Sequence, residues 1–398
     1  MAISDVQEYT HLTSEEVEEL GRKLDAIRAG IEESRGDADA AYINRMITVQ
    51  RRLAAAARVT LMAGRWKPAW LAGTTMLGVA KILENMEIGH NVMHGQWDWM
   101  NDPEIHSSTW EWDTAQPAEQ WKHSHNYVHH QFTNVLGFDN DIGYGILRMA
   151  REQKWHPANL GQPVYNALLA TLFQWGVALH DLDIEAIRKR EKDPKVMRKQ
   201  LRQIWRKVRR QVGKDYVFFP ALTGPAFAHT AAANALANLT RNLWSYAIIF
   251  CGHFPDGALH FTEEEIEDET RAEWYLRQIL GAANFTGGPL LHIMSGNLGF
   301  QIEHHLFPDL PSNRYAEIGE RVRPLCEKYG IPYTTGPLHR QYGQALRTIL
   351  KLSLPNRFTS SDRRDGPHSP EVPRGRRRDD ERPVRRTETG GWTSQATA

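Results

Sequence analysis

Eight histidines of this chain form three tight clusters and one isolated position, and they constrain the fold more than any other feature. The clusters read H-N-V-M-H, H-N-Y-V-H-H and Q-I-E-H-H, and the isolated residue stands in C-G-H-F-P. Along the chain they are His90, His94, His125, His129, His130, His253, His304 and His305. Imidazole is a common ligand for iron, zinc and copper, so distant clusters must converge in space to share a metal. Eight imidazoles exceed the needs of one tetrahedral zinc ion and indicate two metal ions with open coordination positions.

The composition indicates the size class and the compartment of the protein, but not its chemistry. The chain has 398 residues, enough for one large domain or two ordinary ones, and its 48 basic residues equal its 48 acidic ones. A balanced charge gives no sign of a nucleic-acid partner. Cys251 and Cys326 are too few for a disulfide framework and fit a reducing compartment. Residues 1–30 lack an apolar core, so we expect no cleavable signal peptide.

The two ends of the chain are polar. We expect cytosolic helices in residues 1–50, a membrane domain in residues 51–355 and a disordered polar tail in residues 356–398, where no apolar periodicity occurs. Thr13 and Glu16 have the spacing of a capping box. An amphipathic helix packed on its own domain is predicted after them, from the apolar stripe Val17, Leu20, Leu24 and Ile27.

Three apolar stretches lie between these ends, at residues 53–88, 163–179 and 216–250. Residues 69–88 are long enough to span about 30 Å of hydrocarbon. The stretch 216–250 is long enough for two crossings, with a bend expected near Asn238–Asn242. The sequence therefore predicts two helical hairpins, one in 53–88 and one in 216–250.

A basic run fixes the predicted orientation of these hairpins. Residues 186–214 contain thirteen Lys or Arg and two acidic residues, and such runs stay on the cytosolic side. If residues 53–88 enter from the cytosol and return to it, residues 163–179 should not cross. All eight histidines then lie on the cytosolic face. We predict an all-α integral membrane protein with four transmembrane helices in two hairpins, cytoplasmic termini and a cytosolic helical cap that carries the metal site.

Spacing within the clusters indicates shared ligation. His90 and His94 are four residues apart, as are His125 and His129, so on an α-helix each pair shares a face. His130 would point about 140° away from His125 on such a helix. It could then reach the second metal or the opposite side of the first.

The identity of the metal follows from which acidic ligands accompany the histidines. The zinc-protease pattern H-E-x-x-H is absent. Soluble di-iron bundles repeat Glu-x-x-His, and here only Glu87 and His90 have that spacing. Imidazole-rich ligation with open positions suits iron that activates dioxygen.

The order H-x-x-x-H, H-x-x-x-H-H and Q-x-x-H-H resembles the histidine boxes of membrane-bound fatty acid desaturases, over roughly residues 50–350. The stretches E-I-G-H-N-V-M-H-G-Q-W-D-W-M-N-D-P-E-I-H and S-G-N-L-G-F-Q-I-E-H-H-L-F-P-D-L-P resemble bacterial acyl-CoA desaturases, in particular stearoyl-CoA 9-desaturases. The resemblance implies two Fe²⁺ ions at the cytosolic face and a bent tunnel for the acyl chain. It also implies O₂ as co-substrate and a cis double bond as product.

The resemblance also assigns roles to single residues. The seven box histidines would be metal ligands, and His253 resembles the extra ligand found outside the boxes. Gln301 replaces the first histidine of the commoner third box, a form typical of front-end desaturases, so the boxes leave the double-bond position open. Asn297 and Gln301 would support the site, anchor a water or ligate weakly. Asp139 and Asp141 would accept from imidazole N–H groups, or lie in a plain turn.

Weaker candidates concern the substrate and the electron donor. A tryptophan group (Trp97, Trp99, Trp110 and Trp112) would line the acyl tunnel or pack as core. Arg188, Lys189 and Arg190 would meet the CoA phosphates, although topology alone explains that basic run. No H-P-G-G of a fused cytochrome b5 domain occurs. Electrons from NADPH would therefore arrive through a separate flavin and iron–sulfur reductase or a ferredoxin.

Two alternatives remain at this point. A hydroxylase, an acetylenase or a front-end desaturase of the same family would share the boxes. A membrane metal transporter would instead carry polar residues throughout its spans, whereas these histidines lie at span ends.

Overall fold

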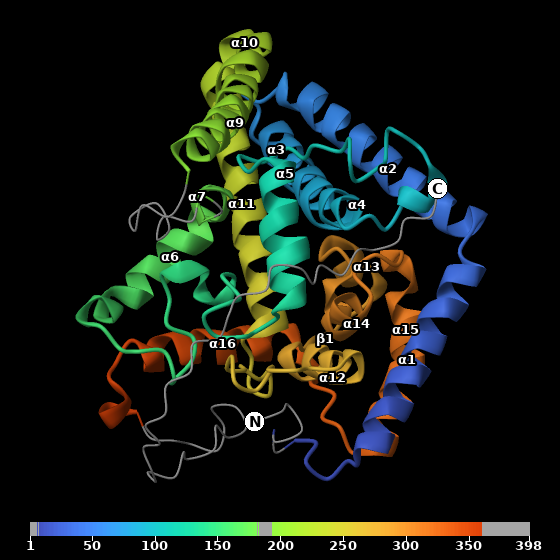
Figure 1. Cartoon of the computed structure of the whole chain (residues 1–398). Coiled ribbons are helices and arrows are strands. Elements are labelled where there is room, and N and C mark those ends of the chain that lie inside the picture. The colour runs from blue at the N-terminus through green and yellow to red at the C-terminus, as the bar shows by residue number, and fades with distance from the viewer. Residues whose placement is uncertain (1–5, 7, 181, 183–192, 360–398) are drawn as a thin grey trace. The chain divides into compact units, whose positions relative to one another are not determined.

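The computed structural model describes residue 6, residues 8–180, residue 182 and residues 193–359 (Figure 1). This part of the chain is mostly helical, as expected. The strands β1 (Asn284–Thr286) and β2 (Thr335–Pro337) form a short parallel pair in which Asn284 lies opposite Thr335.

The first helical hairpin joins α2 (Asp37–Leu61) to α3 (Lys67–Leu83). Pro68 is the second residue of α3, where a backbone N–H would have no partner within the helix. The helix continues beyond α3 as the π-helical segment η2 (Glu84–His90) and the short α4 (Asn91–Met93). The boundary expected between residues 50 and 51 lies inside α2.

The second hairpin joins a long helical run to α11 (Phe227–His253). The run consists of α9 (Pro194–Val212), η7 (Gly213–Phe218) and α10 (Phe219–Leu222). The chain reverses at η8 (Gly224–Ala226), where Gly224 has a φ of +49°. The bend expected near Asn238–Asn242 is wrong, because these residues lie inside one continuous helix. Their polar side chains instead form hydrogen bonds to other helical segments, as Asn238 does to Asp215 of η7.

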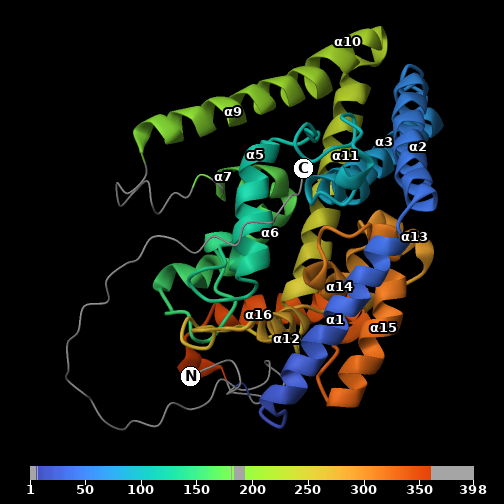
Figure 2. The ribbon, with the colours of Figure 1, turned by 45° about the vertical axis from the view of Figure 1, so that its right-hand side comes forward.

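The two hairpins pack against each other through alanine and leucine side chains. Ala57, Leu61, Leu77, Ala233 and Ala237 form a buried cluster between α2, α3 and α11. Figures 1 and 2 show α11 running from α10 through the molecule to the region of α12 and α16. The last residue of α11, His253, therefore lies at the histidine clusters.

None of the helices within the described ranges combines the length and the apolar character that a membrane crossing needs. The number of crossings stays a prediction. Residues 163–179 form two short helices, α6 (Gln162–Thr171) and α7 (Phe173–His180), separated at Leu172.

The other α-helices of the described chain lie outside the two hairpins in sequence. They are α1 (Ser14–Ser34), α5 (Ala118–Trp121), α12 (Arg271–Gly281), α13 (Pro289–Met294), α14 (Gln301–Leu306), α15 (Tyr315–Tyr329) and α16 (Leu338–Leu352). The capping box of Thr13 and Glu16 is confirmed. Leu20 and Leu24 of α1 are fully buried against α12, α14 and α15 in one apolar core. Residues 360–398, most of the expected tail, lie outside the described residues.

Candidate metal centre

All eight histidines converge, and they come from four parts of the helical framework. His90 ends η2 and His94 follows α4, while His253 ends α11. The second cluster lies on a further π-helical segment, η4 (Lys122–His129), and the third on α14. Seven of the eight are buried and His125 is partly buried.

A π-helix, rather than an α-helix, carries the second cluster. The N–H of His130 donates to the carbonyl of His125, five residues earlier, so residues five apart lie over one another. The rings of His125 and His130 are 5.0 Å apart. The orientation expected for His130, about 140° away from His125, is therefore wrong, because it assumed α-helical rotation.

The imidazoles form two groups. Ligand nitrogens of His90, His94, His125 and His304 lie within 4.8 Å of one another, and so do those of His129, His253 and His305. We call them the first and second histidine groups. His130 lies between them, with its ring 4.8 Å from that of His304 and stacked 4.5 Å from that of His305.

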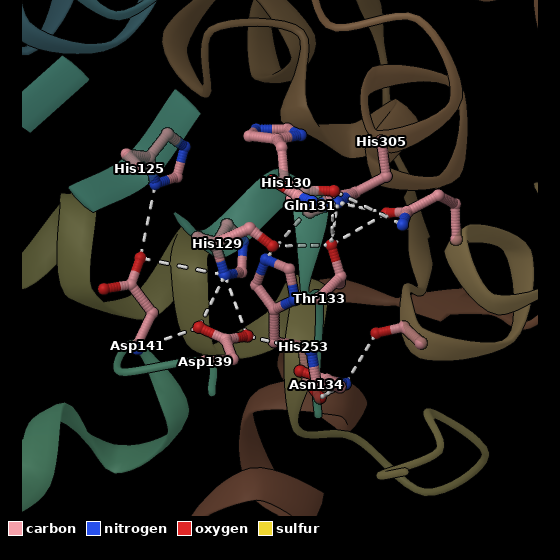
Figure 3. A network of polar contacts seen from close by, with 12 residues as sticks. His125, His129, His130, Gln131, Thr133, Asn134, Asp139, Asp141, His253 and His305 are labelled. Atoms are coloured by element: carbon pink, nitrogen blue, oxygen red, sulfur yellow. Dashed lines mark hydrogen bonds and ion pairs between the residues drawn. The ribbon is translucent and has the colours of Figure 1, made fainter. Parts of the chain in front are cut away.

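Acceptors outside the groups hold the rings by their Nδ1 atoms (Figure 3). Asp139 lies 3.0 Å from Nδ1 of His129, and Asp141 lies 3.2 Å from Nδ1 of His125. Asp139 also accepts from the backbone N–H of Asn134 at 2.8 Å. Carboxylates accept only, so both imidazoles carry their proton on Nδ1 and leave the Nε2 lone pair free.

Three further contacts of this kind carried no signal in the sequence. Nδ1 of His90 lies 3.1 Å from Oδ1 of Asn91, and Nδ1 of His305 lies 3.1 Å from Oε1 of Gln278. The Tyr315 hydroxyl lies 3.1 Å from Nδ1 of His304. Gln278 and Tyr315 lie outside the histidine boxes and belong to no recognisable motif. Their contacts with the histidines are therefore visible only in the fold.

The nitrogens that face inward fit a metal. Within the described residues, Nε2 of His94, His125, His129 and His130 is buried without a hydrogen-bond partner. A buried polar atom without a hydrogen-bond partner lowers the stability of a protein. Several such nitrogens in one cluster therefore indicate that they bind a metal ion in common. Nε2 of His253 and Nε2 of His305 approach to 3.3 Å, as two lone pairs directed at one ion would.

Burial keeps most of these rings neutral, which metal ligation requires. It holds the pKa of His94, His304 and His305 well below the usual value, and neighbouring imidazoles lower it further. At His129 burial also acts downward, but the charge and hydrogen bond of Asp139 outweigh it and raise the pKa. Burial opposes ionisation of Asp141, yet its contacts with His125 and His129 keep its pKa below the usual value.

Gln301 and Asn297, which were both expected to support the metal site, lie in different places. Gln301 lies in the second histidine group, with Nε2 3.0 Å from Nε2 of His253 and Oε1 buried without a partner in the described structure. Turning the amide over would aim Oε1 at the same ion. Asn297 instead donates to the Glu87 carboxylate at 3.0 Å and to the Tyr42 hydroxyl at 3.3 Å.

The carboxylates of Glu87, three residues before the first box, and of Glu303 in the third box accept hydrogen bonds from other side chains. Glu87 accepts from Tyr42 and Ser312 besides Asn297. Glu303 accepts from Asn284 at 2.8 Å and from Tyr333 at 2.7 Å. Neither carboxylate belongs to the two histidine groups, whereas Asp141 forms a further close set with His125 and His129, their ligand atoms lying within 4.8 Å of one another.

A cavity opens beside the histidines and is lined by His90, His125, His129 and His253. Of the tryptophan group, Trp112 lines it, whereas Trp97, Trp99 and Trp110 are not among its lining residues. Trp121, which the sequence did not single out, also lines it and stacks 4.5 Å from the ring of His125. Arg188, Lys189 and Arg190 lie outside the described residues.

Comparison with known proteins places the chain in a family. A family model described as fatty acid desaturase matches residues 65–337. The chain is 54% identical over 373 residues to an NADPH-dependent stearoyl-CoA 9-desaturase of Mycobacterium tuberculosis, which covers 93% of this chain and 87% of that protein. The chain belongs to the fatty acid desaturase family.

A more distant relative has a different printed activity. An sn-1 linoleoyl-lipid 6-desaturase of Synechocystis is 25% identical over 335 residues, covering 80% of this chain and 89% of that protein. The resemblance inferred from the histidine boxes is confirmed at the level of the family.

Proposed function

We propose that this protein is an oxygen-dependent acyl-CoA desaturase that introduces a cis double bond at C9 of a stearoyl group. The observation that carries the proposal is the convergence of eight histidines, seven of them in two imidazole groups, beside a cavity that His90, His125, His129 and His253 line. The similarity to stearoyl-CoA 9-desaturases over nearly the whole chain supports the choice of substrate.

Two Fe²⁺ ions are the proposed cofactors. His90, His94, His125 and His304 would hold one and His129, His253 and His305 the other, with His130 available to either and Gln301 as a weak ligand of the second. When bound, the irons supply the activation of O₂ that removes two hydrogens from adjacent methylenes. Electrons from NADPH would arrive through a separate flavin and iron–sulfur reductase or a ferredoxin.

The residues of the chain orient the reaction. Asp139, Asp141 and Gln278 fix the imidazole tautomers, so that each Nε2 faces inward. Trp112, Trp121 and Ile249 line the cavity beside them. An apolar chain held there would bring its methylenes to the metals while water is excluded.

Expression in a host that lacks the activity tests the proposal. Fatty-acid methyl esters should show a new cis double bond when a matched electron donor is supplied, and its position reads the regiochemistry. The same protein with His304→Ala serves as the inactive control. Absence of any new double bond, despite bound iron and a working donor, would falsify the desaturase proposal. About one zinc per chain would favour the transporter instead.

We also propose that the protein is a multi-pass membrane protein with its active site and both termini cytoplasmic. Met62 and Leu222 are exposed next to the two hairpin reversals, and the native cysteines are buried. Met62→Cys and Leu222→Cys should react with an impermeant maleimide on intact cells. A cysteine at exposed His123, near the metal site, should react only after the cells are opened. The opposite labelling pattern would contradict this orientation.

A further inference from the structure

The helix α9 packs on the rest of the protein with only one of its sides. Ile204 and Gln211 are its buried residues. Beside them, Lys207 pairs with Glu111 at 2.7 Å, which lies between the first two histidine clusters. Most other residues of α9 are exposed. The greater part of its surface is therefore open to the surroundings of the protein.

A stripe of apolar side chains runs along this open surface. Leu201, Trp205, Val208 and Val212 are three or four residues apart, so they share one face of the helix. Trp205 is 61% exposed, and Leu201 and Val212 are exposed as well. A contiguous apolar surface of this kind marks a contact with a partner or with a membrane. We call it the apolar stripe of α9.

Exposed apolar side chains continue past the end of α9. Val217 and Phe218 of η7 are exposed, and so is Leu222 at the end of α10. Figure 2 shows α9 and α10 as one long helical run. The three residues belong to the stretch 216–250, which is expected to cross the membrane and begins four residues after α9 ends. The apolar stripe therefore adjoins the proposed membrane surface.

Four arginines flank the apolar stripe on the side turned away from Ile204, by the helical rotation of about 100° per residue. They are Arg198, Arg202, Arg206 and Arg209, and all four are exposed. Within the described chain, the ion pairs of α9 come from Lys199 and Lys207 instead. A guanidinium binds a phosphate group through two parallel hydrogen bonds. The arginines are thus available to phosphates outside the protein.

A membrane surface that contains anionic phospholipids fits both features of α9. A helix with a basic face and an apolar face that includes tryptophan lies in the plane of the interface between lipid and water. Anionic headgroups attract basic side chains next to a membrane crossing. An acidic protein would satisfy the arginines, but it would leave the apolar stripe and its continuation toward Leu222 uncovered.

We propose that α9 lies in the cytosolic surface of the membrane and binds anionic phospholipids. The apolar stripe enters the acyl-chain region, and the four arginines bind the headgroup phosphates. This interaction goes beyond the proposed catalysis and rests on the membrane location proposed above. It agrees with that orientation, in which the basic run 186–214 lies on the cytosolic side and the crossing begins after it.

The test places a fluorescent label on the apolar stripe. Trp205→Cys is labelled with an environment-sensitive dye in the purified full-length protein, whose native cysteines are buried. The protein is reconstituted into nanodiscs of phosphatidylcholine and phosphatidylglycerol. Equal small amounts of nitroxide-labelled phosphatidylglycerol or nitroxide-labelled phosphatidylcholine then quench the dye. Quenching by the anionic lipid should be about twofold stronger or more, because basic side chains enrich anionic lipid around them, and high salt should reduce the difference.

Matched charge removals separate α9 from the rest of the surface. The α9 variant should bring the two quenching efficiencies close to equality, and it carries Arg202→Gln, Arg206→Gln and Arg209→Gln. The control variant removes three exposed basic residues of α15 and should keep the preference; it carries Arg321→Gln, Arg323→Gln and Lys328→Gln. A dye at exposed Glu320→Cys on α15 should be quenched by neither lipid.

The outcomes distinguish the inference from its foundation. If the protein does not enter the nanodiscs, the membrane location itself is contradicted. Entry with equal quenching by both lipids, or with no quenching at Trp205→Cys, contradicts only the role of α9. A preference that persists in the α9 variant, or that is lost in the α15 variant, overturns the inference as well. A dye response that appears only when an acidic electron-transfer protein is added would assign this surface to a protein partner and also overturn it.

Discussion

At the scale of single residues, the centre depends on which ring nitrogen of each histidine is free. Asp139 and Gln278 each engage the Nδ1 atom of an imidazole and leave Nε2 for a metal. Residues of this kind orient ligands and raise their basicity without touching the ion. Removing one should weaken metal binding while the fold persists.

Asp139→Asn tests this role with little change of shape. The amide cannot hold the Nδ1 proton of His129 as the carboxylate does, so metal affinity of the second histidine group should fall about 10–100-fold. A chelator competition titration measures it. Asp98→Asn, which alters a carboxylate bonded to Ser107 away from the site, should leave affinity unchanged. Equal affinities in both variants would contradict the assignment.

The two histidine groups predict separable metal losses. His304→Ala removes a ligand of the first group and His253→Ala one of the second. Each should lower bound iron from about two toward about one per chain, because the other group keeps its imidazoles. Elemental analysis of the purified proteins reads this directly. The exposed His123→Ala is the control and should retain both ions, so loss of both ions in every variant would argue against two groups.

At the scale of elements, close packing brings the end of α11 against α14. A Cβ added at Gly252 would meet the Gln301 side chain at 2.8 Å. Only a residue without a side chain lets Gln301 lie beside His253. The π-helical segments η2 and η4 each end at a histidine of the centre, His90 and His129.

Gly252→Ala should therefore disturb both packing and ligation. Overpacking costs about 1–3 kcal/mol, and displacement of Gln301 should weaken metal binding by the second histidine group. Gly343→Ala on α16 is a matched control, because nothing lies within 4 Å of its added Cβ. Thermal unfolding in detergent should show a lower melting temperature for Gly252→Ala only. A shift of equal size in Gly343→Ala would refute the packing explanation.

At the scale of the whole molecule, the metals would join segments that the chain brings together from four regions. His90 ends one helical hairpin and His253 the other, while η4 and α14 supply the rest. Ions that bind the folded protein but not the unfolded chain stabilise it by mass action. The histidine centre should therefore be part of what holds the hairpins to the surrounding helices.

Chelation measures this contribution. At a free metal concentration about 100 times the dissociation constant, binding adds about 2.7 kcal/mol to the free energy of unfolding. The metal-free protein should melt at a lower temperature, and added Fe²⁺ should restore the original value under anaerobic conditions. In His253→Ala the difference should shrink. Identical melting curves with and without bound iron would rule out a structural role for the metals.

The sequence by itself determined the spacing of the histidine clusters, the family and the mostly helical fold class, because these follow from local patterns along the chain. Tertiary structure decided the direction of His130, the reversal at Gly224 instead of Asn238–Asn242, and the place of Asn297 on Glu87. It alone revealed Gln278 beside His305 and Tyr315 beside His304. Spacing constrains side chains within one helical turn, whereas contacts between distant segments depend on how whole helices pack, and no local pattern encodes that.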